Sequence, residues 1–335
     1  IYTKAHAILN SVQLFHMAGR AGIRLSQKTG VLLDVSTTSA IRPSFLCHDL
    51  RFCSDVNKKE AQTLIKSLSL LCAAALLSAC GTTYVLPEID ATASTRAQTM
   101  FVEAKADTSR VPSSESLAEK RFQRVSARVQ PVAQRFCELE TQKYEGFDCS
   151  VRVEIDRKLK ERNAYFTYIN DKPVIRLTMP ILQDVESDDE VAFIMSHEYG
   201  HLIGRHIEKQ QQQAIAGALI LGVLTAYSNA QAASVGAYYD PNAVGRNMEL
   251  GAAVGSRAYS QSYELESDTL GTRIAKAAGY DPVKGARFFA RGEETKTEAG
   301  RLSFWGTHPP DEKRLATVIA TNAQIEARQA LQRKQ

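Results

Sequence analysis

The chain has 335 residues, of which 44% are hydrophobic and 23% charged, a composition typical of a globular protein with a sizeable core. A formal net charge of +4 would favour nucleic acid or an anionic membrane as a partner if the basic residues were spread along the chain. However, residues 1–79 hold nine Lys and Arg against four Asp and Glu, and 32 basic against 33 acidic residues remain from Cys80 onward. This balance, together with a sequence that carries no nucleic-acid motif, argues against nucleic acid as a partner.

Residues 56–79 have the pattern of a bacterial lipoprotein signal peptide. A short basic region precedes the apolar run at residues 68–77, and small residues lead up to Cys80 and Gly81. The last four residues of this stretch resemble a lipobox, whose cysteine becomes the first mature residue and carries the lipid. A glycine after that cysteine is typical of sorting to the outer membrane. The alternative, a single membrane-spanning helix, requires about 20 apolar residues, and this run is shorter.

Residues 1–55 show no clean periodicity and no initiating methionine. We therefore expect them to be upstream translation that is not part of the product, or disordered. Val56 would suit an alternative start codon.

Two cysteines remain after Cys80, namely Cys137 and Cys149. In an oxidising compartment such a pair is a candidate disulfide, which would close a loop of about a dozen residues and contribute roughly 2–4 kcal/mol. Two free buried thiols are the alternative.

The mature chain is expected to begin with a tether at residues 80–116, which is rich in Ser, Thr and Ala and ends in a loosely defined helix. A catalytic domain over residues 117–330 follows. Apolar residues spaced by three and four predict an amphipathic helix over residues 117–144, with a kink at Pro131.

The next segments have the alternating pattern of strands. Residues 151–155 predict one strand, and residues 164–169 and 174–178, which flank Asn170-Asp171-Lys172-Pro173, predict a hairpin. The outer edge of such a hairpin can accept an extended peptide by strand addition. Ordinary structural strands are an equally good interpretation of the pattern.

Ser187 and Glu190 form a capping box that opens a helix expected to run to about Gln213. The apolar residues 214–227 that follow are too few to span a bilayer, so we expect a buried helix or a hydrophobic flap near the site, with membrane contact less favoured. Residues 229–256 are rich in Gly, Ala, Ser and Asn and suggest a mobile loop.

The helix carries the pattern H-E-x-x-H at His197, Glu198 and His201. Residues four apart share one face of a helix, so both imidazoles can bind one Zn²⁺ while Glu198 faces a water molecule at the metal. The metal would polarise a scissile carbonyl, and the glutamate would act as general base. The pattern therefore indicates a zinc-dependent peptidase with one zinc per chain.

A zinc site needs a third protein ligand, and Glu264 is the candidate. If its segment is helical, Asp268 lies on the same face and can hold a ligand imidazole by its other nitrogen. Glu266 points elsewhere and is expected to be a solvated surface carboxylate. His206 lies five positions past His201, off the metal face, and is expected to be structural.

H-E-x-x-H is followed about 60 residues later by E-x-x-x-D, and then by Thr307-His308-Pro309 and Arg314. Over residues 117–330 this order resembles the peptidase family of the CAAX prenyl protease. It is most similar to the bacterial lipoprotein and periplasmic branch, with BepA-type and LoiP-type peptidases. The resemblance implies a gluzincin fold of class α+β, mainly α, with a small antiparallel sheet against the motif helix.

The resemblance also implies roles for individual residues. These are zinc binding by His197, His201 and Glu264, general base catalysis by Glu198, and orientation of a ligand by Asp268. His308 would approach the metal, either as a latch on its open position or as a donor to the transition-state oxyanion, with Arg314 nearby in the catalytic group.

The family's substrate-binding edge strand would begin at Asn163-Ala164. This chain departs from the family there, because Tyr165-Phe166-Thr167-Tyr168 replaces a smaller, glycine-containing stretch. The resemblance therefore does not predict the shape of the substrate groove in this chain.

We expect a zinc endopeptidase, lipid-anchored at Cys80 on the periplasmic face of the outer membrane. Its partners would be unfolded or misassembled envelope proteins and the outer-membrane assembly machinery. The alternative is a latched, chaperone-like zinc lipoprotein that rarely cuts. An integral prenyl-protein protease is disfavoured, because nothing after Cys80 reads as long enough to cross a membrane.

Overall fold

The structure is a computed structural model that describes residues 81–107, 110–255, 261–291 and 303–334. The predictions for residues 1–55 and 56–79, and for lipidation at Cys80, lie outside these residues.

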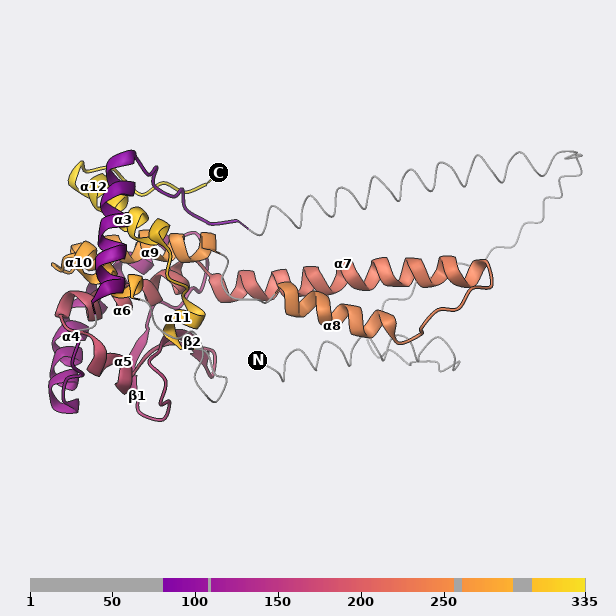
Figure 1. Ribbon diagram of the computed structural model, residues 1–335, viewed down its shortest axis with the longest axis horizontal. Coiled ribbons are helices and arrows are strands. Elements are labelled where there is room, and N and C mark those ends of the chain that lie inside the picture. Colours follow the sequence, from indigo (N-terminus) through magenta and orange to yellow (C-terminus); the bar gives the residue numbers. More distant parts are fainter. Residues whose placement is uncertain (1–80, 108–109, 256–260, 292–302, 335) are drawn as a thin grey trace, which may run out of the picture. The chain divides into compact units, whose positions relative to one another are not determined.

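The described chain is mostly helical, with one small sheet (Figure 1), which confirms the predicted class, α+β and mainly α. The helices are α3 (Ala91–Ala106), α4 (Glu115–Thr141), α5 (Met179–Asp184), α6 (Asp188–Ile203), α7 (His206–Ser234), α8 (Ala243–Gly255), α9 (Gln261–Ala277), α10 (Pro282–Ala286), η1 (Arg287–Ala290), α11 (Phe304–Thr307) and α12 (Glu312–Glu326). The strands are β1 (Arg152–Asp156), β2 (Ala164–Ile169) and β3 (Lys172–Thr178).

The sheet has the order β1-β3-β2, with β3 in the centre. β2 and β3 form the predicted antiparallel hairpin, and Asn170 and Asp171 at its turn have φ of 52° and 60°, values that a two-residue turn of this kind requires. β1 pairs with β3 in parallel, so the sheet is mixed and not purely antiparallel. The parallel pairing arises because the chain leaves β1, crosses to the far edge for β2, and returns through the centre.

Helix α6 forms the centre of the domain and carries the H-E-x-x-H pattern. Ser187 caps it by accepting from the Glu190 backbone N–H, at 3.2 Å, as predicted. The Glu190 carboxylate accepts from the Glu186 N–H and pairs with Arg110. Every residue of α6 from Glu190 to Ile203 is buried, because α4, α9, α10 and the sheet all pack on it.

Helices α6 and α9 approach each other through small residues. A Cβ atom added at Gly200 would lie 2.7 Å from the Ser267 Cα atom, and one at Gly271 would lie 2.9 Å from the His197 backbone nitrogen. These positions lie on the same helix faces as the predicted metal ligands, since Gly200 is three residues past His197 and Gly271 is seven past Glu264. The glycines therefore let the two ligand-bearing faces meet.

The region after the motif differs from the prediction. Helix α6 ends at Ile203, not Gln213, and Arg205 in the left-handed conformation (φ 58°) separates it from α7. The expected loop over residues 229–256 is largely helical, since α7 runs to Ser234 and α8 follows. Alanine is the most frequent of the small residues that suggested a loop, and it has the highest helix propensity.

Residues 214–227 do not form a buried helix. They lie within α7, where only His206, Ala216 and Gly222 are buried. Among the described residues, α7 is long and apolar enough to cross a membrane by length and composition alone. The premise that disfavoured a membrane-integrated protein is therefore wrong, although length and composition do not show that α7 spans a membrane.

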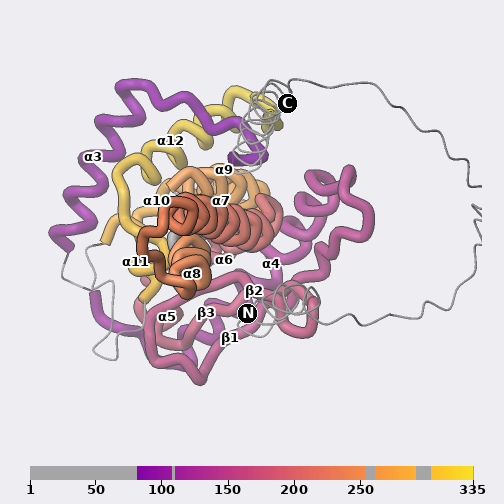
Figure 2. The backbone as a smooth tube through the Cα atoms, turned by 90° about the vertical axis from the view of Figure 1, so that its right-hand side faces the viewer, coloured from indigo at the N-terminus to yellow at the C-terminus, as the bar shows by residue number. Residues whose placement is uncertain are grey.

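The segment expected to be a tether belongs to the packed domain from Thr82 onward. Tyr84 is completely buried, and α3 packs along α12 (Figure 2) through buried Ala93, Ala97 and Phe101. This stripe consists mainly of alanines, whose weak apolar signal did not stand out in the sequence. The domain therefore begins well before residue 117.

Helix α4 continues through Pro131, and its last turns are joined to the chain before β1 by a disulfide. Cys137 and Cys149 form this bond, with their Cα atoms 5.9 Å apart. The bond closes the loop that leads into the sheet.

The contact at Gly200 yields a test of the α6–α9 packing. We expect Gly200→Ala to lower the free energy of unfolding by about 1–3 kcal/mol, because the added methyl group meets the Ser267 backbone. Denaturant unfolding followed by circular dichroism measures this. Gly245→Ala is the matched control, since a Cβ atom there meets nothing within 4 Å and should be neutral or stabilise by about 0.5–1 kcal/mol. Equal stability of the two variants would contradict the proposed packing.

Candidate metal centre

Four buried side chains meet between α6, α9 and the end of α11. They are His197, His201, Glu264 and His308, and their ligand atoms all lie within 4.8 Å of one another. None of the four is more than 2% exposed. The structure therefore brings together the three predicted metal ligands and the predicted latch residue.

The distances between these atoms fit a metal ion. Tetrahedral zinc with ligand bonds of about 2.0–2.2 Å places its ligand atoms roughly 3.3–3.6 Å apart. Here the Nε2 atoms of His197 and His201 are 3.0 Å apart, and they lie 3.4 and 3.5 Å from the Glu264 carboxylate. Buried Oε1 of Glu264 makes no hydrogen bond within the described chain, which suits an atom that faces a cation. The donor set suits zinc.

His197 is oriented by a carboxylate behind it. Its Nδ1 lies 2.9 Å from Asp268 Oδ1. Burial alone would lower the pKa of His197, but Asp268 and Glu264 outweigh burial and raise the pKa to about 9. Asp268 therefore takes the predicted orienting position.

Arg314 lies behind this carboxylate. Its guanidinium donates to both Asp268 oxygens at 2.8 Å and lies 3.2 Å from Glu264 Oε2. Burial opposes the charge of Asp268, but Arg314 outweighs it and holds the pKa of that carboxyl below its usual value. Arg314 was predicted in the catalytic group, and the structure places it where it positions two acidic residues.

His201 is held by a second chain of contacts, which sequence reasoning missed. Its Nδ1 lies 2.9 Å from His206 Nδ1, and His206 Nε2 lies 2.8 Å from Glu266 Oε2. The Tyr84 backbone N–H donates to Glu266 Oε1 at 2.6 Å. His206 is not among the four ligand residues, in keeping with its predicted structural role, but it touches one of them.

The prediction that Glu266 is a solvated surface residue is wrong, because the side chain is fully buried. Glu266 does point away from Glu264 on the helix, as expected, but the segment around Tyr84 covers that side. The break at Gly204 and Arg205, which turns His206 back toward His201, was the one signal in the sequence that could have pointed to this contact.

Glu198 lies beside the four ligand residues. Burial raises the pKa of its carboxyl, with opposing contributions from His308 and His197. Its Oε1 makes no hydrogen bond within the described residues and lies 3.5 Å from His308 Nε2. A carboxylate with a raised pKa and a free oxygen is suited to proton transfer.

The edge strand β2 lies close to Glu198, because the Phe166 backbone N–H contributes to lowering the pKa of the Glu198 carboxyl, against the larger effect of burial. At the start of this strand, Asn163 exchanges hydrogen bonds with Thr178 at 2.9 and 3.0 Å. Thr307 contacts Asn163 Oδ1 at 3.5 Å, and Ala164 is completely buried. Asn163 and Ala164 thus lie where the predicted substrate strand meets the site.

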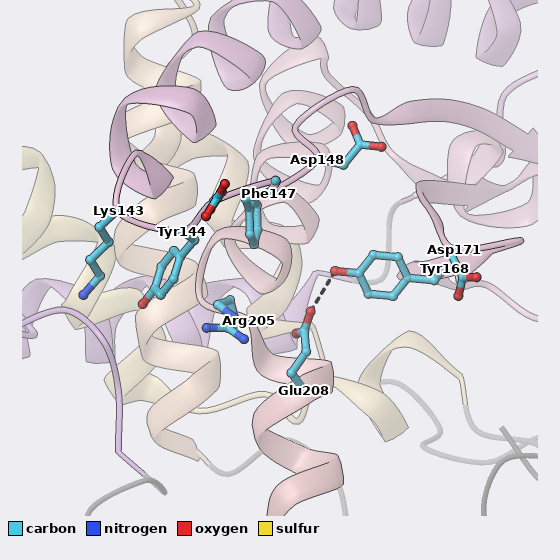
Figure 3. A pocket seen from close by; sticks show the side chains of 10 residues that line it. Lys143, Tyr144, Phe147, Asp148, Tyr168, Asp171, Arg205 and Glu208 are labelled. Carbon is cyan, nitrogen blue, oxygen red and sulfur yellow. Dashed lines mark hydrogen bonds between the residues drawn. The ribbon is translucent and has the colours of Figure 1, made fainter. Parts of the chain in front are cut away.

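A polar hollow of about 590 Å³ lies at the base of α7, and none of the predicted site residues lines it (Figure 3). Tyr168 donates to Glu208 across it at 2.9 Å, and Arg205 lies over the Tyr144 ring. Its lining mixes acidic and basic side chains, so its charge favours no ligand class.

The sequence profile of Peptidase family M48 matches residues 119–322, more than half of the chain. The chain belongs to peptidase family M48. It is also similar to a protein of Vibrio cholerae named "Putative beta-barrel assembly-enhancing protease", with 27% identity over 141 residues. That match covers 39% of this chain and 27% of the relative, so the chain spans about a quarter of the relative's length.

Membership of M48 confirms the predicted metallopeptidase, since the chain unites the family's sequence pattern with a four-residue group that could hold a metal ion. The closer resemblance to the CAAX prenyl protease and its lipoprotein branch stays a prediction.

The contacts behind His201 yield a test in this M48 domain. We expect Glu266→Gln to weaken zinc binding by about tenfold, because residues behind a ligand imidazole fix its orientation and basicity. Competition with a chromogenic chelator measures the affinity. Glu326→Gln is the control, since that carboxylate is 62% exposed on α12 and should leave the affinity unchanged. Unaltered binding by Glu266→Gln would show that the chain of contacts does not support His201.

Proposed function

We propose that the protein is a zinc-dependent endopeptidase. The observation that carries this proposal is the Glu198 carboxylate, buried with a raised pKa and one free oxygen, beside three side chains that fit zinc. His197, His201 and Glu264 would hold the ion. When bound, zinc would supply Lewis acidity toward the scissile carbonyl and toward water.

The chain's own residues supply proton transfer and orientation. Glu198 can take a proton from an attacking water and pass it to the leaving amine, because a raised pKa makes its carboxylate a stronger base than an exposed glutamate. Asp268 and Arg314 keep the His197 ring in one orientation. His206 supports the second imidazole.

A substrate would bind as an extended strand along β2. This strand is at the edge of the sheet, and the Phe166 N–H on it contributes to the pKa of the Glu198 carboxyl. Strand addition uses main-chain hydrogen bonds, so it tolerates many sequences but requires an unfolded segment. Tyr165 and Tyr168 do not swing freely over this edge, because their hydroxyl groups donate to Asp156 and Glu208.

We place this activity in the bacterial envelope, on unfolded or misassembled periplasmic and outer-membrane proteins. Support comes from the name of the Vibrio cholerae relative, which refers to beta-barrel assembly, and from the lipobox pattern ending at Cys80. Lipidation at Cys80 would anchor the enzyme to the outer membrane, facing the periplasm and the assembly machinery.

A second candidate function is a latched zinc protein that binds chains and rarely cuts them. It is favoured by His308, whose Nδ1 lies 3.0 Å from Glu264 Oε2 and 3.3 Å from His197 Nε2. In this position His308 can act as a fourth ligand. A substrate carbonyl would then have to displace it.

Replacing Glu198 tests the endopeptidase directly. We expect Glu198→Gln to reduce cleavage of an unfolded protein by about 10²–10⁴-fold, since an amide cannot accept the proton. Zinc content should stay at one ion per chain, and a chelator should abolish the wild-type activity until zinc is restored. Cleavage by the variant at the wild-type rate would refute the assignment of the base.

Replacing His308 distinguishes the two functions. If the latch is favoured by about 1.4 kcal/mol, His308→Ala should raise cleavage of the same substrate about tenfold. Loss of cleavage would instead mark His308 as a group that the reaction needs. If neither wild type nor His308→Ala cleaves, the endopeptidase proposal fails and the binding function remains.

A further inference from the structure

Helices α7 and α8 lie side by side (Figure 1 and Figure 2), and small or polar residues hold them together. Gly217 and Gly251 pack backbone against backbone, with no room for a Cβ atom on either. Further along the pair, the Asn247 side chain donates to Thr225 Oγ1 at 2.8 Å, and that of Asn229 to the Asp240 carbonyl at 3.1 Å. The interior of this helix pair is therefore narrow and partly polar.

The large apolar side chains of α7 lie outside this contact. They form what we call the α7 stripe, whose members are each 46–66% exposed: Ile215, Leu219, Ile220, Val223, Leu224 and Tyr227. Their spacing of one, three and four residues puts them on one continuous side of the helix. Met248, packed on Gly222, is a large apolar residue inside the contact, but the six stripe residues lie outside it while glycines and hydrogen-bonded polar groups lie within. A helix pair in water normally turns its large apolar side chains inward.

This reversed arrangement is typical of helices in lipid. Lipid chains are as apolar as leucine, so helices there associate through small residues and interhelical hydrogen bonds, and their large side chains face outward. The sequence around the stripe fits such surroundings, since no charged residue occurs between Lys209 and Asp240. A protein partner would normally meet a polar rim and several hydrogen bonds, which a face without charged groups offers poorly.

The other side of the pair limits how deep it can lie. On the outer face of α8, Arg246 and Glu249 are exposed, and Arg246 pairs with Asp240. Tyr238 and Tyr239, in the connection between the helices, are 91% and 43% exposed, and tyrosines favour the headgroup level. One apolar and one charged face describe a helix pair that lies in the membrane surface and does not span it.

We propose that the α7 stripe rests in the surface of a lipid bilayer, with the outer face of α8 toward water. This contact is separate from a lipid at Cys80, and it does not rest on the peptidase activity. It would give the enzyme a second point of attachment to the membrane.

Tryptophan fluorescence in the full-length protein tests this. The chain has one tryptophan, Trp305, which is completely buried and gives a constant background. Leu224→Trp reports on the stripe, and Leu139→Trp on α4 is the matched control, since the two leucines are 59% and 61% exposed. Both variants are bound to vesicles of phosphatidylcholine and phosphatidylglycerol, with and without brominated phosphatidylcholine.

We expect the Leu224→Trp emission to shift to shorter wavelength on vesicles and to be largely quenched by the brominated lipid. Leu139→Trp should do neither. Because both proteins carry the same residues before Gly81, attachment through that region cannot produce the difference. Adding Leu219→Asp to Leu224→Trp should restore much of the lost emission.

Three results would overturn the proposal. The first is equal quenching, or no quenching, of the two tryptophans on vesicles. The second is a Leu224→Trp emission that is already blue-shifted without lipid and reverts on dilution, which would assign the stripe to a second copy of the chain. The third is a shift that requires an unfolded polypeptide and not lipid, which would assign it to substrate.

Discussion

The close contact between α6 and α9 is the constraint on which the rest of the site depends. It brings buried acidic side chains on one helix against buried imidazoles on the other. Buried charges and polar groups are costly unless each finds a partner. Asp268 finds Arg314, and Glu266 finds His206. Among the acidic groups of the site, Glu198 and Glu264 keep an oxygen without a hydrogen bond in the described chain, and both face the centre. The carboxylates behind the ligands are thus paired, whereas the two that face the centre keep an open oxygen.

Distant parts of the chain close over the back of this contact. Tyr84 pairs with Arg333 in an isolated β-bridge, and the Arg333 guanidinium lies over the Tyr84 ring. The Tyr84 N–H donates to Glu266, which contacts His206, and His206 in turn contacts His201. The segment that follows Cys80 is thus a structural support of the metal centre and not a free spacer. A substitution in that segment would alter the orientation of His201 through Glu266 and His206.

Helical periodicity explains which parts of the site were predictable from sequence. Residues four apart share a helix face whatever surrounds the helix, so His197 with His201, and Glu264 with Asp268, could be paired in advance. The hairpin was predictable from a different local pattern, the alternation of apolar and polar residues on either side of a turn. The burial of Glu266 was not predictable, because it depends on Tyr84, a residue 182 positions away. The parallel pairing of β1 likewise follows from the path of the chain and not from any local pattern.

Helices α7 and α8 escaped prediction because their composition is ambiguous. Runs of Ala, Gly, Ser and Asn suit loops in water and tight helix contacts in lipid, and the sequence alone does not distinguish the two surroundings. The structure adds the missing information, because it shows which side chains of the pair are exposed and which lie in the contact between the two helices.

The left-handed residue Arg205 has a mechanical consequence. A residue with a Cβ atom seldom adopts this conformation, so the junction is held by its surroundings. Beyond it, the 29 residues of α7 extend for about 43 Å, whereas His206 lies within the first turn, about 5 Å from the junction. If α7 swings about that junction as a rigid rod, a displacement of its far end reaches His206 reduced about tenfold. The far end of α7 can therefore move by several ångströms with a fluctuating membrane surface. The His206 imidazole behind His201 then moves by less than one ångström.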